Sequence, residues 1–218
     1  MSTDHRPPPP DRARPPCPEQ PLRLRLHEPG ELVAAVPHLL GFRPAESLVV
    51  VAVHGTGRRR RLGVVARADL PPPDDVVAVV DACAQRVLPT GPEEVTAIVV
   101  AEPGEPGSAV PPRADVAEAV RDVFAADGVA VPSRLWAPRI AAGAPWRCYP
   151  PCDCRGAVSA TDDSPVAAAS AWLGHVIYGS RDELEASLAP GAPDPRLRAR
   201  IDAEVRAAVL DRELGGPT

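Results

Sequence analysis

Residues 48–53 form the most apolar run in the chain, and they constrain the fold more than any other stretch. The run reads Leu-Val-Val-Val-Ala-Val and contains no polar side chain. A strand with one wet face alternates apolar and polar residues, so this run predicts a strand that is covered on both faces. The residues before it supply Gly41 as a helix stop and Pro44 as a rigid turn.

Patterns beside this run predict a strand, a helix and a hairpin. Residues 22–27 alternate apolar and polar side chains, which is typical of a strand, and residues 31–40 carry an apolar helical stripe. Pro37 lies inside that stripe, so we expect a kink or two short helices. Residues 54–57 have the composition of a turn and would join the central strand to an antiparallel strand at residues 61–70.

The rest of the chain continues the alternation of helices and strands. We expect a helix capped by Asp74 and ending before Pro89, a strand at residues 94–101 and a helix at residues 113–127. The apolar stripes of the two helices are Val76, Val80, Cys83 and Val87 in the first and Val116, Val120, Val123 and Phe124 in the second. Further elements are a hairpin of residues 135–140 and 145–149, a helix from Ser164 to about Ile177, a helix opened by the capping box at residues 180–183, and a last helix with the stripe Leu197, Ile201, Val205 and Val209. This order predicts an α/β fold: a mixed, partly parallel sheet with helices packed on it, plus a C-terminal hairpin and helices.

Composition bounds the domain organisation and the environment of the protein. Residues 1–21 are rich in Pro and Arg and predict a disordered arm, followed by a single domain over residues 22–214. The net charge of -5 argues against a nucleic-acid partner, and the four arginines at 58–61 are better explained as a solvated loop. No apolar run is long enough to span a membrane and no secretory signal is visible, so we expect a cytoplasmic protein with reduced cysteines.

Residues 39–51, which read Leu-Leu-Gly-Phe-Arg-Pro-Ala-Glu-Ser-Leu-Val-Val-Val, resemble the signature of an actinobacterial family known only as domain of unknown function 4192. Further similar segments are residues 22–37, residues 146–149 with Cys152 and Cys154, residues 164–168 and residues 180–190. The resemblance covers most of the chain from residue 22 to about residue 190, and the cysteine segment looks shortened. No activity is established for the family, so the resemblance implies kinship and leaves the function open.

A polar corner precedes the central strand and contains four candidate ligand-binding residues: His38, Arg43, Glu46 and Ser47. Ligands of α/β sheets bind at strand ends, and Arg43 beside these groups could hold an anion. The corner precedes its strand, however, whereas the rule favours residues that follow one. The structural alternative is that Glu46 and Ser47 satisfy backbone donors and pair with Arg43.

Cys148, Cys152 and Cys154 form the second constellation. Their spacing is not that of a usual zinc knuckle, and a fourth ligand would have to come from His175, Cys83 or Asp153. We therefore predict no cofactor and keep zinc bound by the three cysteines as the alternative. The two-residue Cys spacing of thiol oxidoreductases is also missing, which argues against a redox role.

Trp146, Arg147 and Tyr149 complete the set of candidate ligand-binding residues. The absence of a legible catalytic set favours a non-catalytic domain that binds a small molecule or a protein. The alternative is an enzyme whose site is formed by residues 38–47 and 146–154. One deep pocket lined by both segments would favour the enzyme or a small-molecule binder, whereas a flat surface with the two segments far apart would favour protein interaction.

Overall fold

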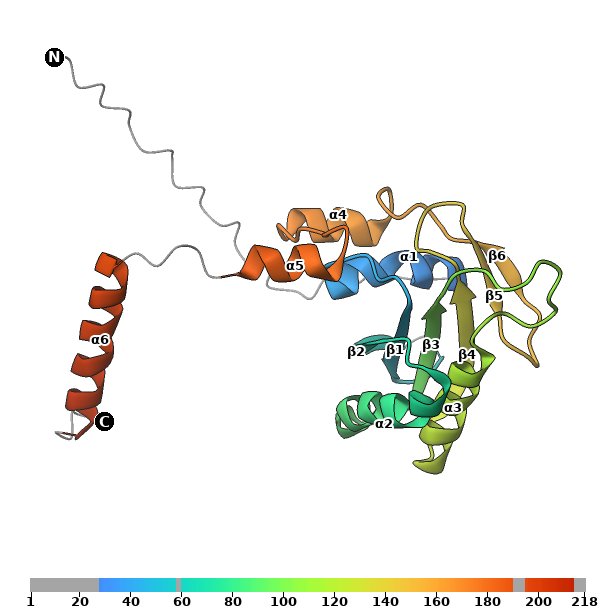
Figure 1. Ribbon diagram of the computed structural model, residues 1–218, viewed down its shortest axis with the longest axis horizontal. Coiled ribbons are helices and arrows are strands. Elements are labelled where there is room, and N and C mark those ends of the chain that lie inside the picture. Colours follow the sequence, from blue (N-terminus) through green and yellow to red (C-terminus); the bar gives the residue numbers. More distant parts are fainter. Residues whose placement is uncertain (1–27, 58–59, 190–194, 214–218) are drawn as a thin grey trace, which may run out of the picture.

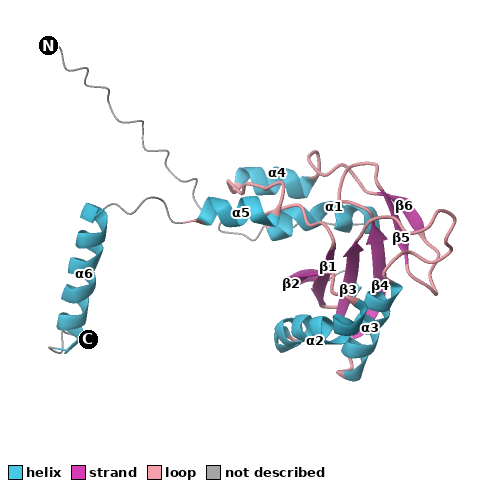
Figure 2. Ribbon diagram, in the orientation of Figure 1, coloured by secondary structure: helices cyan, strands magenta, loops and turns pink. Residues whose placement is uncertain are grey.

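The computed structural model describes residues 28–57, 60–189 and 195–213 (Figure 1). Its centre is a six-stranded mixed sheet in the order β2-β1-β3-β4-β5-β6. The strands are β1 (Ser47–His54), β2 (Arg61–Asp69), β3 (Glu94–Val100), β4 (Ala130–Ala137), β5 (Pro145–Cys148) and β6 (Arg155–Ala157). The helices are α1 (Pro29–Leu40), α2 (Val76–Val87), α3 (Ala114–Ala126), α4 (Pro165–Trp172), α5 (Arg181–Leu188) and α6 (Pro195–Glu213). The predicted α/β class is confirmed (Figure 2).

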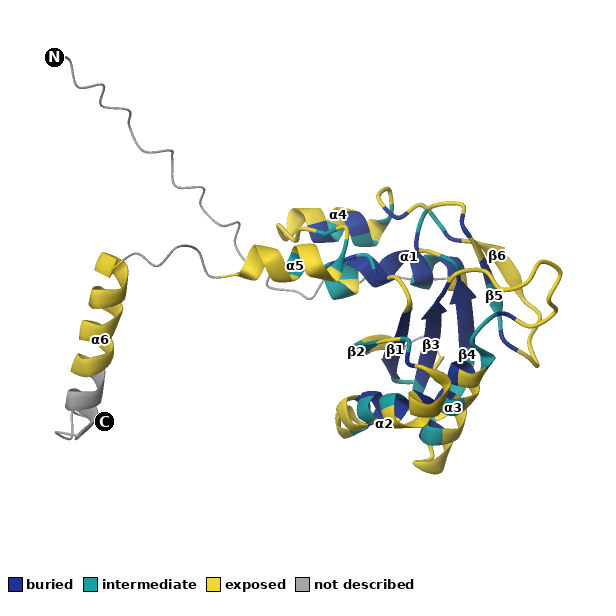
Figure 3. Ribbon diagram, viewed as in Figure 1, coloured by how far each residue is buried: buried dark blue, intermediate teal, exposed yellow. Residues whose placement is uncertain are grey.

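Strand β1 is buried on both faces, as its apolar run predicts. Each residue from 48 to 53 is at most 7% exposed. The strand pairs antiparallel with β2 on one side and with β3 on the other. Because it also lies between two layers of helices, none of its apolar side chains needs to face water (Figure 3).

The helices cover the sheet in two layers (Figure 1). Helices α2 and α3 pack on one face, where Val80 and Phe124 join a core with Val50 of β1. Helix α1 packs on the other face, where Val33 and Val36 join a second core with neighbouring strand residues. The residues of the stripes predicted for α2 and α3 are buried, except Val123, which is partly buried, and Ala84 and Ala117 are buried beside them.

The direction of β1 decides where the polar corner lies. Strands β3 and β4 are parallel, and β1 runs antiparallel to both β2 and β3. Ser47, the first residue of β1, therefore lies beside Asp69 and Val100, the last residues of β2 and β3. The corner precedes its own strand yet lies at the carboxyl ends of that strand's neighbours, which is the edge where α/β sheets bind ligands.

Several element boundaries differ from those predicted. Helix α1 is continuous through Pro37 and is not divided into two. Asp74 lies in a short 3-10 turn, and α2 begins only at Val76. Helix α4 ends at Trp172 and does not continue to residue 177. Strand β4 begins well before the predicted hairpin because its first part pairs with β3, and the short strand β6 has no apolar pattern that would predict it.

The C-terminal elements expose much apolar surface. The exposed large apolar residues of this part are Trp172, Leu173, Val176, Leu188, Leu197, Ile201 and Val205. Three of them, Leu197, Ile201 and Val205, lie on the stripe predicted for the last helix, so α6 forms but leaves these three side chains exposed. Among the described residues, no helix is long and apolar enough to cross a membrane. The strand predicted at residues 22–27 lies outside the described residues.

Candidate functional site

Ser47 and Glu46 of the polar corner join the ends of three strands. The Ser47 hydroxyl donates to the Ala45 carbonyl at 2.6 Å and accepts from Arg67 Nε at 2.9 Å. Glu46 has a positive φ of 40°. Its carboxylate accepts from the backbone amide of Glu102 at 2.9 Å. Glu46 therefore satisfies a backbone donor, as the structural alternative requires, whereas Ser47 accepts from the Arg67 side chain. The expected pairing with Arg43 is replaced by an ion pair between Arg43 and Asp162.

His38 and Arg43 connect the corner to the segment that precedes α4. His38 Nε2 donates to the carbonyl of Thr161 at 3.0 Å. Arg43 forms an ion pair with Asp162 at 3.2 Å and also donates to the carbonyl of Ile140. All four corner residues thus have partners within the chain. A ligand-binding role for them stays a prediction, and their contacts favour a structural one.

Trp146 and Tyr149 are buried, and each has a polar partner. The Trp146 indole donates to the carbonyl of Ala157 at 3.1 Å, and the Tyr149 hydroxyl donates to the carbonyl of Pro112 at 2.6 Å. Burial raises the pKa of the Tyr149 hydroxyl, so it stays protonated at neutral pH. Side chains buried and hydrogen-bonded in this way hold the β5 region against its neighbours and offer little surface to a ligand.

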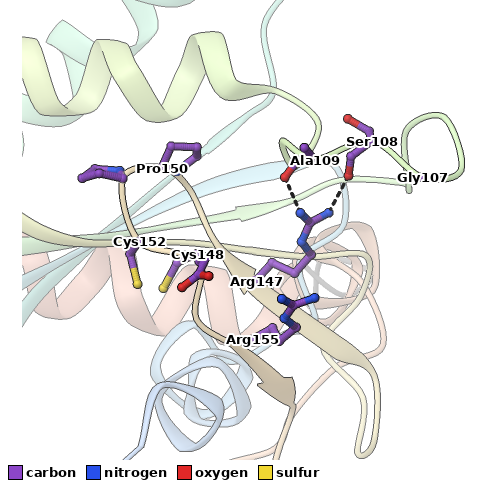
Figure 4. Close-up of a pocket in the computed structure, with 10 residues that line it drawn as sticks. Gly107, Ser108, Ala109, Arg147, Cys148, Pro150, Cys152 and Arg155 are labelled. Atoms are coloured by element: carbon purple, nitrogen blue, oxygen red, sulfur yellow. Dashed lines mark hydrogen bonds between the residues drawn. The ribbon is translucent and has the colours of Figure 1, made fainter.

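Arg147 lies beside them but is exposed to a pocket. Its guanidinium donates to the carbonyls of Ser108 and Ala109, in the loop between β3 and α3 (Figure 4). Arg155 of β6 is its direct partner in the antiparallel register between β5 and β6. Two cationic side chains therefore lie opposite each other on neighbouring strands.

The three cysteines meet at the end of this same pair of strands. Cys148 is the last residue of β5 and Cys154 precedes β6, and the Cys148 amide donates to the Cys154 carbonyl at 2.8 Å. Cys152 lies in the connecting loop, where its sulfur accepts from the Cys154 amide at 3.4 Å. All three sulfur atoms lie within 4.8 Å of one another. A hairpin thus brings together thiols whose spacing does not match a zinc knuckle.

The surroundings of the three thiols shift their pKa values in different directions. Burial, followed by the hydrogen bond and charge of Cys152, raises the pKa of Cys148 to about 12. Hydrogen bonds from the Cys154 side chain and backbone lower the pKa of Cys152. The hydrogen bond to Cys152 in turn raises the pKa of Cys154. Cys152 is therefore the thiol that ionises first, and its neighbours stabilise the thiolate.

A pocket of about 570 Å³ opens beside the thiols (Figure 4). Its lining residues come from the 107–109 loop and from the β5–β6 hairpin: Gly107, Ser108, Ala109, Arg147, Cys148, Pro150, Pro151, Cys152, Asp153 and Arg155. No residue of the 38–47 corner lines it. The two segments proposed for an enzyme site therefore do not share this pocket.

The three predicted sources of a fourth ligand differ in their positions. Cys83 belongs to α2 and is buried in the core, where burial raises the pKa of its thiol. Among the described residues, the group of converging donor atoms consists of the three cysteines, and neither His175 nor Asp153 belongs to it. Asp153 does line the pocket and is the nearest of the three in sequence.

One protein family matches the chain over most of its length. Its description is domain of unknown function (DUF4192), and the match covers residues 29–217. The chain belongs to the DUF4192 family. No curated protein and no solved structure matches the chain.

The signature that resembled DUF4192 in the sequence has a clear structural role in this member. It spans the end of α1, the polar corner and most of β1, and Gly41 ends the helix with a φ of 82°. The sequence prediction missed Arg67 as the partner of Ser47 and missed Arg155 as the partner of Arg147 in the strand register. Both are arginines on strands adjacent to a predicted site residue, and only the register of the hairpins could have identified them.

Proposed function

We propose that this DUF4192 domain binds a thiophilic metal ion, with zinc as the first candidate, through Cys148, Cys152 and Cys154. The observation that carries the proposal is the convergence of the three sulfur atoms within 4.8 Å of one another. In a tetrahedral zinc site with Zn–S bonds of about 2.3 Å, sulfur atoms lie roughly 3.8 Å apart. A shift of about an ångström in two exposed side chains would reach that separation.

The chemistry of the donor set favours a soft ion over a hard one. Three thiolates select zinc or copper(I) over magnesium or calcium, which prefer oxygen ligands. Cys152 and Cys154 are exposed, so an ion can reach the site from solvent. The lowered pKa of Cys152 makes it the thiol that loses its proton to the ion most easily. This assignment departs from the sequence-based expectation of no metal, because the spacing that argued against zinc does not take the hairpin into account.

The proposal describes the domain as a metal-binding module. The alternative is an enzyme whose active site is this same metal site. Three protein ligands with an exchangeable fourth are the arrangement of catalytic zinc, whereas structural zinc has four protein ligands. Asp153 is the carboxylate that lines the pocket and the residue that a proton-transfer step would use. An enzyme with its site at the 38–47 corner has less support, because that corner does not line the pocket.

Elemental analysis of the purified full chain, loaded with zinc under reducing conditions, tests the metal site. We expect close to one zinc ion per chain, and we expect Cys152→Ser to lose it. The matched control is Cys83→Ala, which removes a cysteine that is buried in the core and does not belong to the cluster, and it should leave the zinc content unchanged. A chain that retains less than about a tenth of an equivalent, although loaded with excess zinc at neutral pH, would exclude the proposed site.

A further inference from the structure

We infer that the fourth ligand of this metal ion is a small oxyanion, a phosphate or a carboxylate group, held in the pocket by Arg155. The inference rests on the proposed metal site. Zinc takes four ligands, and three converge from the described residues. A fourth donor from outside this group must therefore approach through the surface that the cysteines leave accessible, and Cys148 and Cys152 both line the adjoining pocket.

The arginine pair is the independent observation. Arg147 and Arg155 lie directly opposite each other on β5 and β6, and both line the pocket. Like charges at directly opposed positions of an antiparallel pair destabilise the sheet. Because both arginines line the same pocket, an anion bound there would reduce the repulsion between them.

The two guanidinium groups have different roles. Arg147 donates to two backbone carbonyls of the 107–109 loop, which fixes its position and uses part of its donor capacity (Figure 4). In the described part of the chain, Arg155 has neither an ion pair nor a hydrogen bond from its side chain. Its planar donors match the geometry of a carboxylate or phosphate, so Arg155 is the residue that would contact the ligand.

The charges of the pocket permit such a ligand. A zinc ion with three thiolates carries one net negative charge. The lining also contains two arginines and one carboxylate, Asp153, so the side chains other than the cysteines contribute one net positive charge. The two charges cancel, so the site as a whole is neutral. The positive charge of Arg155 then offsets the repulsion between the thiolates and an incoming oxyanion.

The size and walls of the pocket indicate the class of ligand. A volume of about 570 Å³ is within the range of small-molecule sites and exceeds what an inorganic ion needs. Pro150 and Pro151 give one wall an apolar surface, and the 107–109 loop contributes a polar edge. The fitting ligand is a small organic molecule whose phosphate or carboxylate group reaches the metal and Arg155.

Cobalt(II) bound to the full chain provides a probe, because its visible absorption changes when a ligand of the ion is exchanged. The cobalt-loaded protein is titrated with inorganic phosphate and separately with acetate, at an ionic strength held constant with chloride. We expect a saturable spectral change with at least one of the two anions, which also identifies the preferred group. Arg155→Gln should weaken that binding by about tenfold or more, as expected for the loss of a charge-assisted contact.

Arg139→Gln is the matched control, because Arg139 is an exposed arginine that does not line the pocket. It should bind the anion as the unchanged protein does. Cobalt binding without any response to phosphate or acetate would overturn this inference and leave the metal site standing, as would a response that Arg155→Gln does not alter. A chain that binds no cobalt would overturn the metal site itself, and the coordination role of the anion with it.

Discussion

Cys148 and Cys154 lie opposite each other one residue beyond the Arg147–Arg155 pair, at the end of the β5–β6 ladder. The same two strands therefore position both the thiols and the arginines. A change in register of one residue would turn these side chains to the other faces of the strands and separate the sulfur atoms. The short hairpin is the element on which the candidate site depends.

The first prediction concerns the pH dependence of metal binding. Thiols bind a metal ion as thiolates, and the pKa values of Cys148 and Cys154 are raised, so both thiols are protonated at neutral pH. Binding must release at least these two protons, and the zinc affinity should therefore rise with pH by about a hundredfold or more per unit. Competition with a chelator at pH 6 and pH 8 measures this slope. A zinc affinity that does not change between these values would mean that the thiols are not the ligands.

The second prediction concerns thiol reactivity in the metal-free protein. Cys152 is exposed and its pKa is lowered by hydrogen bonds, whereas Cys83 is buried and its pKa is raised by burial. Cys152 should react with iodoacetamide at least about tenfold faster than Cys83, since the thiolate is the reactive form. Peptide mapping by mass spectrometry measures both rates in one sample. Added zinc should protect Cys152 and leave Cys83 unchanged, and equal rates at the two residues would contradict the prediction.

The sequence predicted those parts of the fold whose residues carry a periodic pattern. The apolar run of β1 predicted burial on both faces, and the stripes of α2 and α3 predicted the faces that these helices bury. The antiparallel pairing of β1 with β3 could not be read from the sequence. The chain passes from β2 through α2 to β3, which pairs with β1 on the side away from β2, so β1 and β3 are neighbours in the sheet but not in the chain.

The candidate site was predicted only in part, and for physical reasons. Trp146 and Tyr149 were expected to contact a ligand, but an isolated aromatic residue has no periodicity to show whether it is buried or exposed. The cysteine spacing was compared with that of zinc knuckles, in which two ligands lie on one tight turn. Here Cys148 and Cys154 meet across two strands, and β6 is too short and too polar to be predicted.

The third prediction tests the structural role of the polar corner. Arg67 donates to Ser47, forms an ion pair with Asp69 and lies 5.8 Å from the centre of the Phe42 ring, with 11% of its side chain exposed. Arg67→Ala removes these contacts together and should lower the free energy of unfolding by about 2–3 kcal/mol. Denaturation by urea measures the change.

The control for Arg67 is Arg86→Ala. Arg86 lies on the exposed side of α2, where its guanidinium donates only to the carbonyl of Ala82 among the described residues. Its removal should change the free energy of unfolding by no more than about 0.5 kcal/mol. Equal effects of the two substitutions would show that the corner contacts do not stabilise the fold and would reopen a binding role for Ser47.

The last prediction concerns the close approach of α1 to the β5–β6 hairpin at Gly30. A Cβ atom at this position would lie 2.5 Å from the Ala157 carbonyl oxygen and 2.9 Å from Trp146 Nε1, the two atoms of a partly buried hydrogen bond. Replacing glycine by alanine stabilises the interior of a helix by about 1 kcal/mol, and that gain is an upper bound at Gly30, the second residue of α1. Overpacking against backbone costs about 1–3 kcal/mol, so the steric term should win and Gly30→Ala should destabilise the protein by about 1–2 kcal/mol. Thermal and urea unfolding measure the net change in the free energy of unfolding.

Gly104→Ala is the control for Gly30→Ala, because the nearest atom to its new Cβ would be Pro112 Cβ at an ordinary 3.6 Å. A Gly30→Ala variant as stable as this control would mean that α1 does not hold the hairpin, and that the cysteines depend on the sheet alone for their position.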